Sequence, residues 1–327
     1  MKVKHKSALS FLLALVMILS LFAGPAFPAK AAGTDDAWQQ ITQGMLNWQE
    51  EIDITACAVT KDEFLSSIWP QVVTRNPDLF YVWDITYYTD SATDIVTTIK
   101  VIYNTKYNRD SVREYEAALD RAYNEVIRTD MSDVQKALAL HDYLVQHMEY
   151  DQAGVTAGTE KRNAYEALVN GIGVCEGYTL AYAALLEKAG IESDYCESRA
   201  MNHIWNYVKL NNNWYHVDVT QDDVSKDRKG IVSHRYFLNS TTQLLADGNH
   251  HSLDTTTACT DTSYDTMYWQ EEDISAVFPV ANKEYFIRAR KNDQNLYLGG
   301  IDLVERTGSS EKIITHYDTQ WILGSTM

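Results

Sequence analysis

The sequence predicts an α+β fold in which a cysteine at a helix N-terminus packs on an antiparallel sheet, behind a small α+β module. The first observation is Cys175, which stands between glycines in GVCEG and precedes a helix-like run. Strand-like segments follow over residues 193–199, 203–210 and 213–220. His203 and Asp218 belong to the last two of them. A thiol at a helix start, with an imidazole and a carboxylate on later strands, is the arrangement of a cysteine-nucleophile enzyme.

Residues 1–31 have the pattern of a secretory signal peptide. Lys2, Lys4 and Lys6 precede the apolar run Ala8–Gly24, and the small residues around Ala29-Lys30-Ala31 offer a cleavage site. An uncleaved membrane anchor is the alternative, but the run is short for a bilayer span. We therefore expect a secreted or cell-surface protein without stable membrane insertion after cleavage.

The acidic composition limits the partners. The net charge is −17, which disfavours binding to nucleic acid and to anionic lipid. Removal of the signal peptide would take away lysines and no acidic residue, so the mature chain would be still more acidic. Composition does not indicate the oligomeric state.

Four cysteines occur, at positions 57, 175, 196 and 259. Disulfides are common in exported proteins, but a nucleophilic Cys175 must stay reduced. Cys57, Cys196 and Cys259 then allow at most one disulfide. Because the sequence has no CxxC pair and no His/Cys cluster with zinc spacing, it predicts neither a metal nor a cofactor.

The first module is expected over residues 34–130. Apolar spacing and turn residues predict helices at 35–51, 62–73 and 110–128, and paired strands at 76–88 and 94–104.

The second module is expected over residues 131–245 and begins at Ser132, a suitable N-cap. His141 lies on the apolar stripe of the first helix, where a satisfied core histidine is favoured over a catalytic one. A surface loop at 151–161 and helices at 163–170 and 176–189 should follow, the last ended by Gly190.

The two later strands should form a hairpin with a turn at Asn211-Asn212, since asparagine tolerates positive φ. This register pairs Leu210 with Asn213 and sets Asp218 opposite Trp205. His203 then lies diagonally from Asp218 on the same face, within side-chain reach. A slip of one residue would put the two on opposite faces.

The helix start supplies free N–H groups and a positive dipole end that lower the pKa of a thiol. The backbone N–H of Cys175 is a candidate oxyanion donor, and the Tyr165 side chain is the candidate for a second. Trp205 is expected to line the cleft or the core. Glu176 is interpreted as a structural residue at the helix start.

Beyond residue 240 the pattern weakens. Residues 241–263 are polar and predict a loop, in which His250-His251 favour a solvated position over a metal site. The segment 265–327 should be short and β-rich. Tyr285–Arg290, Leu296–Leu298 and Gln320–Leu323 resemble one repeat of a ricin-type β-trefoil lectin, which points to a truncated repeat or a chance match.

Three motifs, AYEALVNGIGVCEGYTLAYAALLEKAGI, NHIWNYVKLNNNWYHVDVT and HRYFLNS, resemble the transglutaminase-like superfamily of papain-type cysteine enzymes. The resemblance runs from about residue 132 to 239, and NPDLFYV in the first module resembles the N-terminal region of exported bacterial members. It implies a transglutaminase-like core with Cys175 as nucleophile, His203 as base and then acid, and Asp218 as the orienting carboxylate. It implies no calcium activation.

Two departures from the family pattern concern the cleft. The segment ESRAM before Asn202 is bulkier than the usual small turn. His216 lies two residues before Asp218 and could compete for its carboxylate.

The resulting hypothesis is a secreted, cysteine-dependent amide hydrolase or acyltransferase acting through a thioester on extracellular protein or cell-wall peptide. Hydrolysis is favoured over crosslinking because nothing marks a site for a lysine amine. The alternative is a catalytically idle protein- or glycan-binding module at the cell surface. A disulfide oxidoreductase is excluded by the lack of CxxC.

Overall fold

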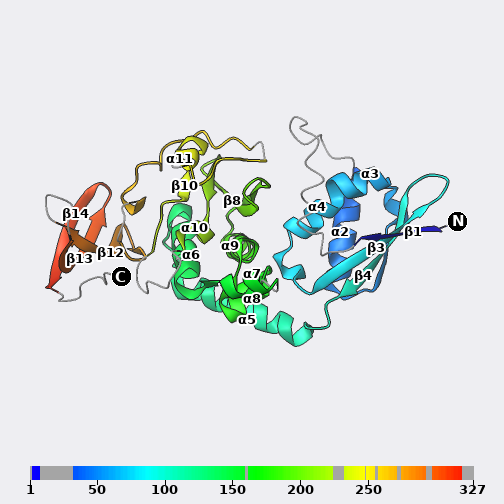
Figure 1. The fold of residues 1–327 in the computed structure, drawn as a ribbon, viewed down its shortest axis with the longest axis horizontal. Helices are drawn as coiled ribbons and strands as arrows, with labels where there is room; N and C mark the ends of the chain where they lie inside the picture. The colour runs from blue at the N-terminus through cyan, green and yellow to red at the C-terminus, as the bar shows by residue number, and fades with distance from the viewer. Residues whose placement is uncertain are drawn as a thin grey trace. The chain divides into compact units, whose positions relative to one another are not determined.

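The computed structural model describes residues 2–7, 32–158, 161–223, 232–246, 248–254, 257–270, 274–291 and 297–318. The chain divides into two compact units, residues 1–114 and 115–327. Both combine helices with antiparallel sheets, which confirms the predicted α+β class (Figure 1).

The first unit is built on a four-stranded antiparallel sheet. Its strand order is β1 (Lys2–Ser7), β3 (Val82–Asp90), β4 (Val96–Tyr103) and β2 (Glu51–Asp53). The accompanying helical segments are α2 (Ala32–Leu46), α3 (Lys61–Glu63), η3 (Phe64–Ile68), α4 (Trp69–Thr74) and the start of α5 (Arg109–Val126). The predicted pairing of the two long strands is confirmed, with Ile85 opposite Val101. Trp48 stacks on Tyr81 at 4.3 Å between ring centroids and helps to close this core.

The predicted signal peptide falls largely outside the described residues. Its first part, Lys2–Ser7, pairs with β3 as an edge strand, whereas residues 8–31 are not described. Signal-peptide cleavage therefore stays a prediction. In the described ranges, every helix is too short or too polar to cross a bilayer.

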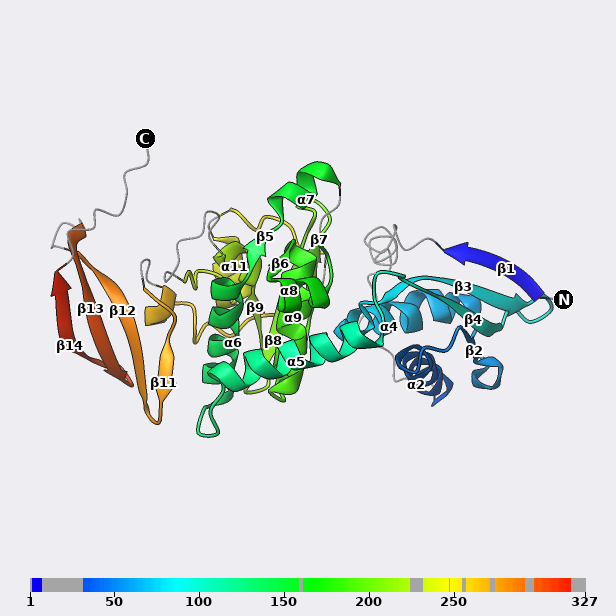
Figure 2. The ribbon, with the colours of Figure 1, turned by 90° about the horizontal axis from the view of Figure 1, so that it is seen from below.

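The second unit holds the three strands that were predicted around His203. Together with a fourth strand, β10 (Phe237–Asn239), they form an antiparallel sheet in the order β10, β9 (Asn213–Val217), β8 (His203–Leu210) and β7 (Ser193–Ser198). α9 (Cys175–Lys188) packs against β8, and α6 (Asp133–His147) packs against α9 (Figure 2). Fully buried apolar side chains fill the space between helices and sheet: Leu140, Leu144, Tyr182, Leu185, Leu186, Val208 and Val217. The hydrophobic effect of this burial holds α9 against the sheet.

Local capping sets the helix limits in this unit as predicted. The Ser132 hydroxyl accepts from the backbone N–H of Gln135, which in turn closes a capping box at the start of α6. Asn163 caps α8 (Ala164–Asn170), and Gly171 ends it at φ 65°. The short strands β5 (Glu149–Tyr150) and β6 (Ile172–Gly173) pair in parallel, and β6 leads directly into α9.

Three predicted irregular or extended segments are wrong in part. Residues 151–161 contain α7 (Gln152–Ala157), because the Asp151 carboxylate accepts from the N–H of Gly154 and nucleates a turn. The strand at 213–220 stops at Val217, because Asp218 caps α10 (Val219–Asp222). The loop at 241–263 begins with α11 (Thr241–Leu245). In each case a side-chain cap outweighed the weak apolar pattern.

The C-terminal residues form a separate antiparallel sheet within the second unit. Its strands follow in chain order: β11 (Phe278–Val280), β12 (Lys283–Lys291), β13 (Tyr297–Thr307) and β14 (Ser310–Asp318). Phe286 and Val304 join the core of this unit. Leu296 and residues 320–323 of the lectin-like pattern lie outside the described residues, so that resemblance stays a prediction.

A buried network of histidine and aspartate side chains connects α6 with α10 and with the chain segments ahead of β10 and β11. His141 contacts Asp142 through Nδ1 at 3.0 Å and Asp222 through Nε2 at 3.1 Å, and His234 Nε2 contacts Asp142 at 2.7 Å. The N–H of Val277 donates to the second oxygen of Asp142 at 2.8 Å. The expectation that His141 is a satisfied core histidine is confirmed, since it is fully buried between two carboxylates.

The charges of this network stabilise one another. Burial alone would lower the pKa of His141, but its hydrogen bonds to the carboxylates of Asp142 and Asp222 raise it to about 9. Burial would raise the pKa of Asp142, but His234 and His141 lower it to about 2. The network therefore ties α6 and α10 to the chain segments ahead of β10 and β11.

Removal of one partner should be costly. We expect Asp142→Ala to lower the free energy of unfolding by about 3 to 5 kcal/mol, because buried His141 loses a counter-ion and buried His234 loses its hydrogen-bond partner. Asp133→Ala, on the exposed face of the same helix, should cost less than about 1 kcal/mol. Urea denaturation of the three proteins measures both; equal losses would contradict a stabilising role for the network.

Candidate active site

Cys175 lies at the first position of α9 and is half-buried. Val174 gives the helix no side-chain cap, so the N–H groups of the first turn face the region of the thiol without an intrahelical partner. The helix dipole adds positive potential there. The sequence prediction for this residue's position is thus confirmed.

Two polar side chains hold the start of α9 against β8. The Thr179 hydroxyl lies 2.8 Å from the carbonyl oxygen of Cys175 and 3.1 Å from that of Ile204, so it can donate to either. Asn206 Nδ2 donates to the Thr179 carbonyl at 3.1 Å. These hydrogen bonds fix the position of Cys175 relative to β8, the strand that carries His203.

The predicted hairpin brings His203 and Asp218 together. Leu210 pairs with Asn213, and Asn211 and Asn212 adopt φ values of 51° and 65°. His203 Nε2 lies 2.5 Å from Asp218 Oδ2. Asp218 reaches this position from the end of β9, as the cap of α10, rather than from within the strand.

His203 and Asp218 strongly shift each other's pKa. Burial alone would lower the pKa of His203, but the charge and hydrogen bond of Asp218, with smaller contributions from a hydrogen bond and charge of Cys175, raise it to about 10. Burial would raise the pKa of Asp218, whereas His203 and His250 hold it well below its usual range. Because Nε2 of His203 faces Asp218, Nδ1 is the nitrogen available to the Cys175 thiol.

His250 is a site residue that the sequence prediction missed. It is fully buried, and its Nε2 lies 2.8 Å from the same oxygen of Asp218 that His203 contacts. The expectation of a solvated loop is wrong for His250 but correct for His251, which is exposed. The polar sequence around it gave no sign of burial; the only available signal was the histidine itself.

Trp205 is a buried neighbour of His203. Its ring stacks on His203 at 5.4 Å, and its Nε1 donates to His216 Nδ1 at 3.1 Å. His216 therefore does not compete for Asp218 and instead reaches Thr241 through Nε2 at 3.1 Å. Burial lowers the pKa of His216 to about 3, so the ring is neutral in this contact.

Tyr165 lies half-buried on α8, and its role as an oxyanion donor stays a prediction. Glu176 lies 3.4 Å from Arg162 Nη1, in keeping with a structural role.

Two histidine–aspartate groups in the described residues have atoms close enough to surround a cation: His141, Asp142 and His234, and His203, Asp218 and His250. In both, imidazole nitrogens already contact the carboxylates at hydrogen-bond distance.

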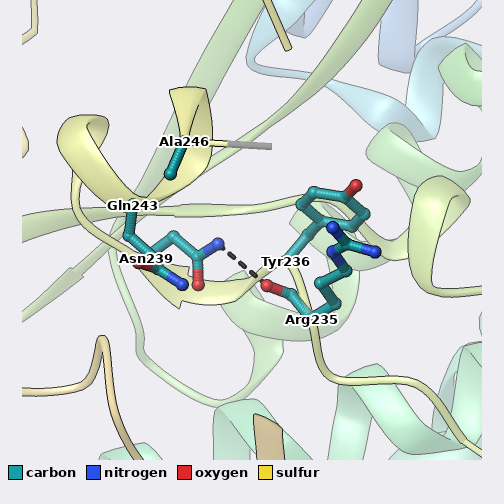
Figure 3. Close-up of a pocket in the computed structure, with 5 residues that line it drawn as sticks. All are labelled: Arg235, Tyr236, Asn239, Gln243 and Ala246. Carbon is teal, nitrogen blue, oxygen red and sulfur yellow. Dashed lines mark hydrogen bonds between the residues drawn. The ribbon is translucent and has the colours of Figure 1, made fainter. Parts of the chain in front are cut away.

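A small pocket of about 150 Å³ lies beside the site, lined by Arg235, Tyr236, Asn239, Gln243 and Ala246 (Figure 3). Asn239 Nδ2 donates to the Arg235 carbonyl at 2.9 Å across it. The Tyr236 ring packs on His250 at 4.8 Å, so this residue belongs to both the pocket and the site.

None of the four cysteines forms a disulfide in the described structure. Cys196 and Cys259 share one buried cluster with Trp205, and burial, followed by the proximity of Cys196, raises the pKa of Cys259 to about 12. Cys57 lies in the other unit. The condition that Cys175 remains a thiol is thus met in this structure.

Comparison with known proteins gives a family for the central segment. The family model of the transglutaminase-like superfamily matches residues 120–219. A search of curated proteins finds no significant match. Among solved structures, a TGase is 10% identical with a TM-score of 0.33, covering 45% of this chain and 46% of that one.

Two further structures have similarly low similarity. A putative cysteine protease from Cytophaga hutchinsonii is 14% identical with a TM-score of 0.27, covering 42% of this chain and 61% of that one. An arylamine N-acetyltransferase from Bacillus cereus is 12% identical with a TM-score of 0.27, covering 66% and 71%. The chain thus spans about half to two thirds of the first two structures.

The family match contains Cys175, His203 and Asp218 and supports cysteine-based catalysis. The segment from residue 120 to residue 219 is a transglutaminase-like domain.

Proposed function

We propose that this protein cleaves or transfers amide bonds through a thioester on Cys175, with His203 as proton carrier and Asp218 as its orienting partner. The observation that carries the proposal is the His203–Asp218 contact of 2.5 Å beside a cysteine at a helix N-terminus. Each member comes from a different element, and a purely structural role requires no such convergence.

The first half of the reaction forms the thioester. The Cys175 thiolate attacks the carbonyl carbon of the amide, and the N–H groups at the start of α9 stabilise the negative oxygen. Protonated His203 donates from Nδ1 to the leaving nitrogen, the C–N bond breaks, and an amine departs. Asp218 holds the ring and stabilises its positive charge.

The second half releases the acyl group. His203, now neutral, accepts a proton from water or from a primary amine, which attacks the thioester. Water gives a carboxylic acid and an amine gives a new amide; in both cases the thiol of Cys175 is regenerated. We favour hydrolysis, because the chain carries no recognisable site for a lysine amine.

We further propose that the substrate is an extracellular protein or a cell-wall peptide. The signal-peptide pattern in residues 1–31 supports an exported protein, and the acidic charge supports neutral or basic substrates. The position of the C-terminal sheet within the same unit is compatible with an accessory role in binding.

Product analysis separates the two reactions. We expect the protein to release acid products from glutamine-containing and cell-wall peptides, and to form amide adducts less readily when a primary amine is added. Cys175→Ala should lower either rate by about a thousandfold or more. Mass spectrometry of the peptides measures both. Binding to cell-wall material without turnover, unchanged in Cys175→Ala, would instead favour a non-catalytic binding module.

The pH dependence should report the raised pKa of His203. The proton donor is present below that pKa and lost as the pH rises through about 10, so kcat/KM should fall on the alkaline side near pH 10. Asp218→Asn removes the main cause of the raised pKa and should move this limb toward the ordinary value of about 6.5. Asp261→Asn, on an exposed loop, is the matched control and should leave the limb in place. An alkaline limb near 6.5 in the native protein would contradict this assignment.

A further inference from the structure

The carboxylate of Asp218 serves two histidines at once. His203 Nε2 lies 2.5 Å and His250 Nε2 lies 2.8 Å from the same oxygen, Oδ2. The other oxygen, Oδ1, accepts the backbone N–H of Gln221 at 3.1 Å. All three contacts converge on a fully buried side chain, so each one affects the charge that the others meet.

The contacts of His250 indicate which of its nitrogens carries the proton. Its Nδ1 is buried and, within the described residues, has no hydrogen-bond partner. A proton on Nδ1 would be a buried donor without an acceptor, which is costly, whereas a lone pair there costs less. The favourable arrangement is therefore one in which Nε2–H donates to Asp218 and Nδ1 keeps its lone pair.

Aromatic side chains fix the orientation of this ring. Trp205 meets His250 edge-on at 5.0 Å, and Tyr236 does so at 4.8 Å from another side. Asn249 Nδ2 donates to the Tyr236 hydroxyl at 2.7 Å and anchors that ring in turn. Since Trp205 also stacks on His203, both histidines are held by one aromatic wall.

We propose that His250 is a positioning residue that holds the Asp218 carboxylate from the side opposite Gln221 and weakens its hold on the His203 proton. Two donors on one oxygen share its electron density, so each hydrogen bond is weaker than it would be alone. The effect of this hydrogen bond on catalysis rests on the proposed function. The hydrogen bond between His250 and Asp218 is independent of that function.

Ionisable groups from β8, α9, β9 and the chain ahead of β10 lie around the Asp218 carboxylate and His250. His203 approaches from β8, and Cys175 at the start of α9 contributes to the raised pKa of its imidazole. His216 approaches from β9 and is held neutral by burial. The Tyr236 phenol, ahead of β10, stacks against the Arg235 guanidinium at 5.7 Å. None of these groups replaces the Nε2–H that His250 gives to Asp218.

The test is the pKa of the His203 imidazole, measured by ¹H–¹⁵N NMR in the full-length protein. His250→Phe keeps a ring against Trp205 and Tyr236 but removes the donor. We expect it to raise the pKa of His203 by about half a unit to one unit, the scale of one charge-assisted hydrogen bond shared at this site. His250→Gln can still donate and should stay near the native value. His251→Phe, at the exposed neighbour, should leave the pKa unchanged.

An unchanged or lowered pKa of His203 in folded His250→Phe would overturn the proposal, as would an equal rise in His250→Gln. Should His250→Phe not fold in thermal melts, His250→Leu is measured in its place with the same expectation. The NMR readout needs no turnover. If His250→Phe raises the pKa of His203 but the native protein has no activity, only the proposed function is refuted. If the native protein is active but His250→Phe leaves the pKa of His203 unchanged, only the role of His250 is refuted.

Discussion

The arrangement of the second unit depends on one buried carboxylate, that of Asp218. It ends β9, caps α10 and accepts hydrogen bonds from His203 and His250. An ionised carboxylate in a core is stable only when several donors surround it, and here the chain supplies donors from a strand, a loop and a helix N-terminus. The same contacts that make the charge tolerable also orient the imidazole beside Cys175. Stability of the fold and readiness of the site thus rest on the same hydrogen bonds.

The short helix α10 links this carboxylate to the second polar network. Asp218 caps its first turn and Asp222, near its end, contacts His141 at 3.1 Å. The N–H of Tyr236 donates to Asp222, and the Tyr236 carbonyl accepts the N–H of Asp218. Small movements in either network would therefore be transmitted over a single helical turn. Close packing on both sides leaves little room for such movement, which suits a site whose geometry must be set before substrate arrives.

The sequence predicted the central part of the site because that part follows local rules. Two asparagines set a tight turn, the turn set the register, and the register placed His203 near Asp218. Gly171 and Gly190 likewise predicted where α8 and α9 end. His250 could not be predicted, since it reaches Asp218 from a polar loop 32 residues away with no periodic pattern. The contacts of His141 with Asp222, and of His234 with Asp142, join residues 81 and 92 positions apart and are equally invisible to local patterns. Asp218 itself was expected on a strand, but its carboxylate favours the helix cap that ends β9.

In the proposed reaction Cys175 carries the acyl group during turnover, and an acid-quenched reaction can trap that group on the thiol. The protein is mixed with a glutamine-containing peptide, quenched in acid within one turnover, and digested for mass spectrometry. We expect an acyl adduct on Cys175 that hydroxylamine removes, with none on Cys57, whose thiol pKa is raised by burial, Asp36 and Asp53. Turnover that proceeds without an adduct on Cys175, or that persists in Cys175→Ala, would contradict it.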